Sequence, residues 1–164
     1  NAEEYILEDI NIHINSGESI GIIGGTGSGK TTLCKAISGQ DVSIGEMNYR
    51  STQTTDIING TFIDTPGQYI ENKWYGSLTI ISADCDIMAI CQDCTNMENV
   101  FPPSFAGIFA KPVIGIITKM DLCEDMNSIK MVEEMLSMAG AETIFKVSSL
   151  SKFGFEEIKK YIKN

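Results

Sequence analysis

The chain is poor in arginine, histidine, tryptophan and proline, and it lacks a long apolar run. Its 164 residues include one histidine, one tryptophan and four prolines, and Arg50 is the only arginine. No apolar stretch approaches the roughly 18–20 residues that span a bilayer, and we see no basic and apolar secretory leader. The single histidine, His13, lies in an expected strand, which argues against a Ser-His-Asp or Cys-His catalytic arrangement. These absences predict a cytoplasmic protein without a membrane span.

Basic residues are scarce as well. Lysine and arginine number 12 against 22 aspartates and glutamates, which gives a formal net charge of −10 at pH 7. This acidic balance repels the phosphate backbone of nucleic acids and anionic lipid surfaces. We therefore expect no nucleic-acid partner. A phosphate ligand has to be held by a local binding site, because the net charge of the protein repels it.

Cysteine occurs five times at scattered positions, and the odd number argues for a reduced, cytosolic protein. One C-x-x-C pair, "CQDC", covers 91–94. A zinc site would need two more ligands near it. We expect instead that Cys91 ends a buried strand and that Cys94 begins a loop.

Apolar periodicity alternates between strands and helices along the chain. The expected strands cover 5–14, 18–23, 54–60, 61–65, 86–93, 112–119 and 141–149. The expected helices cover 31–38, part of 69–83, 126–140 and 154–164. This alternation predicts one α/β domain, 1–164, with three α/β/α layers around a mostly parallel, doubly wound sheet. An antiparallel hairpin of 5–14 with 18–23 precedes it, a second hairpin turns at Asn59-Gly60, and the methionines of 126–138 are expected to fill the core.

A glycine-rich turn, "GGTGSGKT" (24–31), joins an expected strand to an expected helix. It fits G-x-x-x-x-G-K-[ST], the phosphate loop of P-loop proteins, in the structural context that this motif requires. Glycines let backbone N–H groups point at phosphate oxygens at the helix N-terminus. Lys30 is expected to reach the β- and γ-phosphates, and Thr31 to place its hydroxyl on Mg²⁺. The expected nucleotide-binding residues here are Gly25, Thr26, Gly27, Ser28, Gly29, Lys30, Thr31 and Thr32.

A second motif, "TFIDTPGQ" (61–68), ends an apolar strand with a carboxylate. Asp64 is placed to hold a water of the Mg²⁺ shell. The Gly67 N–H can then touch the γ-phosphate, so this loop senses whether that phosphate is present. The sequence thus predicts a second phosphate-facing segment next to the first.

A third motif, "TKMD" (118–121), follows the strand "VIGII". With G-x-x-x-x-G-K-[ST] and D-T-P-G in order, each at a strand end, the chain resembles the Ras-like GTPases. In that family the motif's aspartate reads guanine: Asp121 would accept from N1–H and N2–H₂, whereas adenine would leave the carboxylate unpaired. Lys119 would lie along the base and brace the phosphate loop. Thr118 replaces the commoner asparagine, and Ser148 and Ser149 in "VSSLSKFG" stand where the family's Ser-Ala loop contacts the base.

From about residue 50 to the end, the chain resembles a narrower family. "FIDTPGQYIENKWYGSL", "SADCDIMAICQD", "FPPSFAGIFAKPVIGIITKMDL" and "AGAETIFKVSSLSKFGFEEI" closely resemble the EutP/PduV family of ethanolamine and propanediol utilisation and bacterial microcompartments. Residues 1–49, with "YILEDINIHINSGESIGIIGGTGSGKTTL", resemble the start of an ABC-transporter ATPase domain. We interpret the chain as a join of the two, natural or engineered, near 48–52.

Candidate catalytic residues are Gln68, Lys30 and Thr52. Gln68 follows D-T-P-G and is the residue type with which Ras-like enzymes orient the attacking water; the EutP/PduV relatives usually carry glutamate there. Resemblance to that family's K-T-Q makes Thr52 the switch threonine and a third metal-site residue beside Thr31 and Asp64. Arg50 could supply transition-state charge, although a solvated arginine is the favoured interpretation.

Three functions stay open. The first is a slow GTPase or switch that uses Mg²⁺ and GTP or GDP, with ATP or ADP as the alternative nucleotide. The second is an ATP-dependent kinase of a small acid such as acetate. The third is a nucleotide-binding microcompartment adaptor without significant catalysis, whose partners would be shell proteins or pathway enzymes. The sequence fixes neither the oligomeric state nor the choice between hydrolysis and phosphotransfer.

Overall fold

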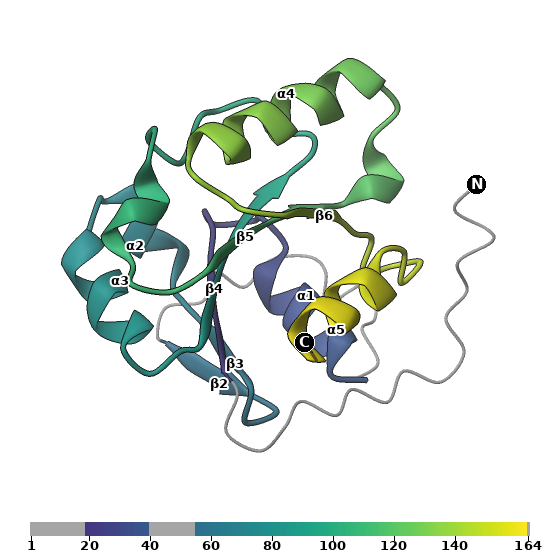
Figure 1. The fold of residues 1–164 in the computed structure, drawn as a ribbon. Helices are drawn as coiled ribbons and strands as arrows, with labels where there is room; N and C mark the ends of the chain where they lie inside the picture. Colours follow the sequence, from purple (N-terminus) through teal and green to yellow (C-terminus); the bar gives the residue numbers. More distant parts are fainter. Residues whose placement is uncertain (1–18, 40–54, 164) are drawn as a thin grey trace.

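The computed structural model describes residues 19–39 and 55–163 (Figure 1). The strand expected at 5–14, and with it the first hairpin, lies outside the described residues, as do Arg50 and Thr52. The strands are β1 (Ile20–Ile23), β2 (Asp56–Ile58), β3 (Phe62–Asp64), β4 (Ile87–Asp93), β5 (Val113–Thr118) and β6 (Ile144–Lys146). The helices are α1 (Lys30–Ile37), α2 (Gly67–Glu71), α3 (Tyr75–Ser82), η2 (Phe105–Ile108), η3 (Met120–Leu122), α4 (Met126–Met138) and α5 (Phe155–Lys163).

The strands form one six-stranded sheet in the order β2-β3-β1-β4-β5-β6. All described pairings are parallel except that of β2 with β3. Because the strands are parallel, the carboxyl ends of β1, β3, β4 and β5 meet at one edge, where open α/β sheets bind ligands. The expected α/β fold with a mostly parallel, doubly wound sheet is confirmed.

Helices cover both faces of this sheet (Figure 1). One core cluster joins α1 and α5 to one face, with Leu33 and Ile158 among its buried members. The other joins α2, α3 and α4 to the opposite face, with Leu78 and Val132 among its members. Neighbouring residues of a strand enter different clusters, as Ile22 and Ile23 do, because side chains alternate across a strand. The three-layer α/β/α arrangement is thus confirmed.

The turn at Asn59-Gly60 joins β2 to β3 as expected. Asn59 has φ 55° and Gly60 has φ 66°, two successive left-handed residues of the kind that an Asn-Gly turn supplies, and the Thr61 N–H donates to Ile58 O at 3.2 Å to close the turn. Ile58 then pairs with Phe62 across the hairpin. Local turn chemistry therefore sets the register that brings Asp64 to the end of β3.

Segment 69–83 contains the expected helix as α3, and a second short helix, α2, precedes it. Lys73 takes φ 58° between α2 and α3, a left-handed conformation that a continuous helix cannot contain. The break lets α2 turn toward the phosphate loop while α3 packs on the sheet through the buried Leu78.

The methionines of α4 fill the core only in part: Met135 is half-buried and packs against the core, whereas Met126, Met131 and Met138 are exposed, so for these three the expectation was wrong. The buried stripe of the helix is Ile129, Val132 and Leu136, whereas Met126 is 79% exposed and Met138 is 62% exposed. Successive helical residues are about 100° apart, so Met138, two positions after Leu136, projects from the opposite side.

Candidate functional site

The phosphate loop runs from the end of β1 to the start of α1. Gly27 and Gly29 have φ 80° and 87°, left-handed conformations that glycine adopts at little cost. They curl the chain so that the Ser28 N–H donates to Gly25 O at 3.1 Å, and α1 begins directly afterwards at Lys30. The loop has the form that places backbone N–H groups around an anion at a helix start.

Thr31 and Asp64 meet beside this loop. The Thr31 hydroxyl donates to Asp64 Oδ2, and Asp64 is fully buried at the end of β3. The pairing of Ile22 with Asp64 brings the carboxylate next to β1. Hydroxyl and carboxylate oxygens are ligands that suit Mg²⁺, so these two residues fit the metal site that the sequence predicts. The third expected metal-site residue, Thr52, lies outside the described residues.

The D-T-P-G segment lies directly against the phosphate loop. The Thr65 hydroxyl donates to Ile22 O at 2.7 Å, which ties the segment to β1. A Cβ added at Gly67 would come within 2.5 Å of Thr26 N, so only glycine permits this approach. Gln68 follows in the first turn of α2 with an exposed side chain.

Glu71 also reaches the phosphate loop, and the sequence analysis missed it. The Thr26 N–H donates to Glu71 Oε1 at 2.5 Å. Glu71 follows Gly67 by four residues in α2, so both lie on one face of that helix. An acidic residue four positions after the D-T-P-G glycine was the available signal.

The "TKMD" segment is bound to the same loop from the other side. The Thr118 hydroxyl donates to Ser28 O, and Lys119 Nζ donates to Gly27 O at 2.7 Å. Lys119 Nζ also lies 2.8 Å from Asp93 Oδ2. Asp93 was not singled out from the sequence, although it ends an apolar strand just as Asp64 does.

Asp121 is held by the loop after β6. The hydroxyl of Ser148, which is 1% exposed, donates to Asp121 Oδ1 at 2.6 Å. The Ser151 N–H donates to Ser148 Oγ at 3.2 Å, which fixes the serine in turn. Ser149 is half-buried next to it, and Thr32 is half-buried in α1. The expected phosphate and base motifs are therefore brought together at one edge of the sheet.

Buried cysteines lie beneath this edge. Cys91 is inside β4 rather than at its end, because the strand continues to Asp93; Cys94 follows the strand, as expected. Burial raises the pKa of the Cys91 thiol to about 12 and the pKa of the Cys34 thiol well above its ordinary value. The Cys94 thiol donates to Lys119 O at 3.1 Å. These thiols stay protonated at neutral pH, so they pack as small apolar groups.

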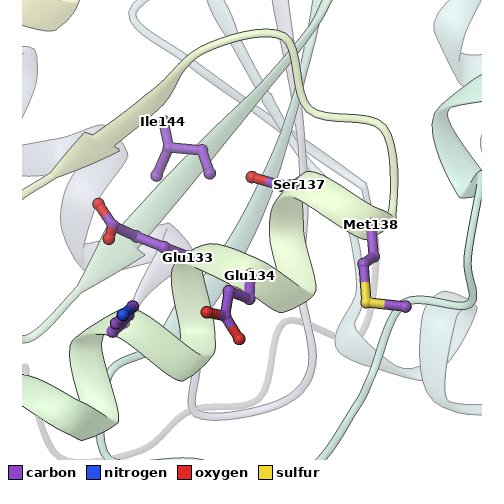
Figure 2. A pocket seen from close by; sticks show the side chains of 6 residues that line it. Glu133, Glu134, Ser137, Met138 and Ile144 are labelled. Atoms are coloured by element: carbon purple, nitrogen blue, oxygen red, sulfur yellow. The ribbon is translucent and has the colours of Figure 1, made fainter.

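Two hollows accompany the site. A cavity of about 80 Å³ adjoins the phosphate loop and is lined by Thr26, Gln92 and Asn96 among others, which is room for ordered water. A groove of about 530 Å³ lies between α4 and β6, far from the loop, with Glu133 and Glu134 on its wall (Figure 2). It contains no residue of the three motifs.

None of the helices in 19–39 and 55–163 has the length and the apolar character of a membrane-spanning segment.

The strand order, the glycine loop and the three strand-end motifs define a P-loop α/β protein. Era from Aquifex aeolicus, solved with GDP and AlF₄⁻, is similar in fold. The TM-score is 0.62 at 21% sequence identity, and the match covers 88% of this chain and 56% of that one. The chain thus spans little more than half of the Era chain, and the likeness concerns the fold.

The sequence comparisons define the family. A family model, "PduV-EutP: Ethanolamine utilisation - propanediol utilisation", matches residues 18–164. The propanediol utilization protein PduV of Citrobacter freundii is 35% identical over 138 residues, which are 84% of this chain and 87% of that protein. The chain belongs to the PduV-EutP family. Family and fold together support a nucleotide-binding P-loop protein linked to propanediol or ethanolamine utilisation.

The ABC-transporter likeness is shorter. A putative ABC transporter ATP-binding protein of Pyrococcus abyssi is 46% identical over 39 residues, which are 24% of this chain and 14% of that protein. The chain spans only a small part of that relative. The family match begins at residue 18, ahead of the expected join near 48–52, so it includes the phosphate loop. A join within the chain stays a hypothesis.

Proposed function

We propose that the chain is a Mg²⁺-dependent, guanine-nucleotide-binding protein that hydrolyses GTP slowly and serves as a switch in ethanolamine or propanediol utilisation. The observation that carries the proposal is the pair of contacts from Thr118 and Lys119 to the phosphate loop. They tie the segment that contains Asp121 to the segment that would hold the phosphates. One ligand with a base and phosphates can therefore engage both.

The phosphate end of the proposed site is assigned to the loop 25–32. Lys30 neutralises phosphate charge, while Thr31, Asp64 and Thr52 hold Mg²⁺. The bound ion would supply charge neutralisation between the outer phosphates. Gly67 contributes its N–H on the terminal phosphate, and its contact with Thr26 supports this placement.

The base end is assigned to Asp121, which would accept from guanine N1–H and N2–H₂. An ionised carboxylate has about four acceptor positions. The hydrogen bond from Ser148 occupies one of them, so the Asp121 carboxylate can still accept from two further donors. Lys119, which donates to Gly27 O in the loop, would lie along the base, and the Ser149 N–H would contact the base oxygen. Adenine would leave the Asp121 carboxylate without a donor, which supports GTP and GDP over ATP and ADP.

Hydrolysis is assigned to Gln68, which orients the attacking water. Its exposed position at the start of α2, next to Gly67, supports this role. Arg50, the chain's only arginine, is interpreted as a solvated side chain that adds no transition-state charge, so the expected intrinsic rate is slow, on the order of 10⁻⁴–10⁻² s⁻¹. Such a rate suits a protein whose bound nucleotide changes its contacts with microcompartment shell proteins or pathway enzymes in the cytoplasm.

Single-turnover hydrolysis tests this function. The purified protein, with Mg²⁺, is mixed with GTP or ATP, and released phosphate is followed for the wild type, Gln68→Ala and Lys30→Ala. Lys130→Ala, on the distant helix α4, is the control. We expect slow GTP hydrolysis, at least tenfold slower in Gln68→Ala, and no phosphate release in Lys30→Ala. Acetyl phosphate formed from ATP and acetate, without GTP hydrolysis, would replace this function by that of a small-acid kinase.

A further inference from the structure

One amide of the phosphate loop already has an acceptor within the chain. The Thr26 N–H donates to Glu71 Oε1, and a Cβ added at Gly25 would lie 3.5 Å from the same oxygen. Glu71 is the last residue of α2 and is exposed, so its carboxylate lies over the loop surface. A backbone amide has one hydrogen. Another anion can take the Thr26 amide only by displacing Glu71.

The position of Thr26 indicates which phosphate would compete. Lys30 and Thr31 lie where α1 begins, whereas Thr26 lies near the other end of the loop, against Gly67 of the D-T-P-G segment. Gly67, whose N–H is assigned to the terminal phosphate, lies directly against Thr26, so a nucleotide bound in this way has its terminal phosphate beside the Thr26 amide. A diphosphate ends before this point.

We propose that Glu71 and the terminal phosphate of a nucleoside triphosphate compete for the Thr26 amide, so that Glu71 sets the preference of the site between triphosphate and diphosphate. The inference rests on the proposed function, since it requires a nucleotide at this loop. Two anions at one amide repel each other. A triphosphate therefore has to expel the Glu71 carboxylate, while a diphosphate binds with the carboxylate in place.

Displacement of Glu71 is transmitted to α2 and Trp74. In the five-residue helix α2 only Gly67 and Ile70 are buried, so few core contacts oppose its movement. Trp74 follows three residues after Glu71, and its backbone N–H donates to Tyr69 O at 2.8 Å. Its ring lies 5.8 Å from that of Tyr69 and the residue is 48% exposed. As the chain's single tryptophan, Trp74 reports the position of α2 by its fluorescence.

The test is the ratio of two affinities. Dissociation constants of GDP and of β,γ-imido-GTP, each with Mg²⁺, are measured for the wild type, Glu71→Gln and Glu71→Ala. ADP and β,γ-imido-ATP are measured in parallel. Glu134→Gln, on α4, is the matched control because it makes the same change in net charge at an exposed site outside the three motifs. Trp74 fluorescence is recorded in each titration.

We expect both Glu71 variants to bind the triphosphate analogue roughly tenfold more tightly. This factor corresponds to the loss of one competing charged hydrogen bond, taken at the lower end of the usual strength of such bonds. Diphosphate affinity should change less than about twofold, and Glu134→Gln should change neither. In the wild type, the triphosphate analogue should shift Trp74 fluorescence more than GDP does. In Glu71→Ala that difference should disappear.

An unchanged triphosphate-to-diphosphate ratio in Glu71→Gln and Glu71→Ala, with binding intact, overturns the competition and makes the contact a structural tie. Weaker triphosphate binding in the variants overturns it as well, because Glu71 would then assist the ligand. If the wild type binds neither nucleotide pair, the proposed function fails and the inference fails with it. If the adenine pair binds in place of the guanine pair, the base assignment fails, and the ratio for adenine nucleotides still decides the inference.

Discussion

Asp121 depends on one neighbour for its orientation. Its Oδ1 accepts the Ser148 hydroxyl at 2.6 Å, and Ser148 is itself fixed by the Ser151 N–H. Lys119 is constrained in the same way by Gly27 O and Asp93. Each side chain assigned to the base is therefore held by a partner from another loop, as a preorganised site requires.

Removal of the Ser148 hydroxyl should weaken guanine-nucleotide binding. Ser148→Ala takes away one hydrogen bond to the Asp121 carboxylate, so we expect a loss of roughly tenfold in GDP affinity. Equilibrium titration with a fluorescent GDP analogue measures it. Ser137→Ala, an exposed serine on α4, should have no effect. An equal loss in both variants would show that the hydroxyl does not act through Asp121.

The buried thiols should make the folded protein less stable as the pH rises into the alkaline range. Cys91 has an ordinary pKa of 9.0 and a folded pKa of about 12, since burial disfavours the thiolate. The unfolded chain loses this proton first, so the stability present below pH 9 is lost as the pH rises toward 12. The free energy of unfolding should fall by about 1.4 kcal/mol per pH unit for this thiol.

Urea unfolding at pH 8, 9, 10 and 11 measures that slope. Cys91→Ala should lower stability at pH 8 but reduce the slope between pH 9 and 11. Ile90→Val, a deletion in the same strand without a titratable group, should lower stability and leave the slope unchanged. A slope in Cys91→Ala equal to that of the wild type would contradict the burial argument.

At the scale of elements, the junction between the β6 loop and α5 depends on a glycine. Gly154 has φ 79°, and a Cβ there would lie 1.9 Å from Lys146 O. Gly154→Ala should therefore destabilise the protein by roughly 2–4 kcal/mol, from steric overlap and left-handed strain. Thermal or urea unfolding measures the change.

Gly76→Ala is the matched control for this substitution. A Cβ at Gly76 meets nothing within 4 Å, and its φ is not left-handed. Because alanine favours a helix over glycine, stability should stay equal or rise by up to about 1 kcal/mol. Equal losses in the two variants would mean that the loss at Gly154 is not due to its backbone.

Elements with strong local signals could be predicted from the sequence, and those set by tertiary contacts could not. The apolar runs of β4 and β5 and the Asn59-Gly60 turn were expected close to where they lie. The break at Lys73 was not, because it is settled by how α2 meets the phosphate loop. For the same reason the sequence indicated Gly67 and Asp64 but not Glu71, whose role depends on a contact 45 residues away.

At the scale of the whole molecule, the parallel sheet brings the segments of the site together. Segments 24–31, 64–68 and 118–121 are far apart in sequence, and strand order places their ends at one edge. This part of the site could be predicted, since each motif follows an apolar strand. The mutual contacts, such as Lys119 with Gly27 O, required the packed structure. The groups that we propose to bind phosphate are therefore gathered at one place, although the net charge of the chain is negative.

The most direct test of the account is a change of base preference at Asp121. Asparagine at this position offers an N–H₂ where the carboxylate accepts, which suits xanthine, because xanthine carries an oxygen in place of the guanine N2 amino group. Affinities of GDP, XDP and ADP with Mg²⁺ are measured for the wild type and Asp121→Asn. We predict that the wild type prefers GDP over ADP by roughly 10² or more, and that Asp121→Asn loses this preference and gains XDP binding. Equal binding of ADP and GDP by the wild type, unchanged in Asp121→Asn, would contradict the account.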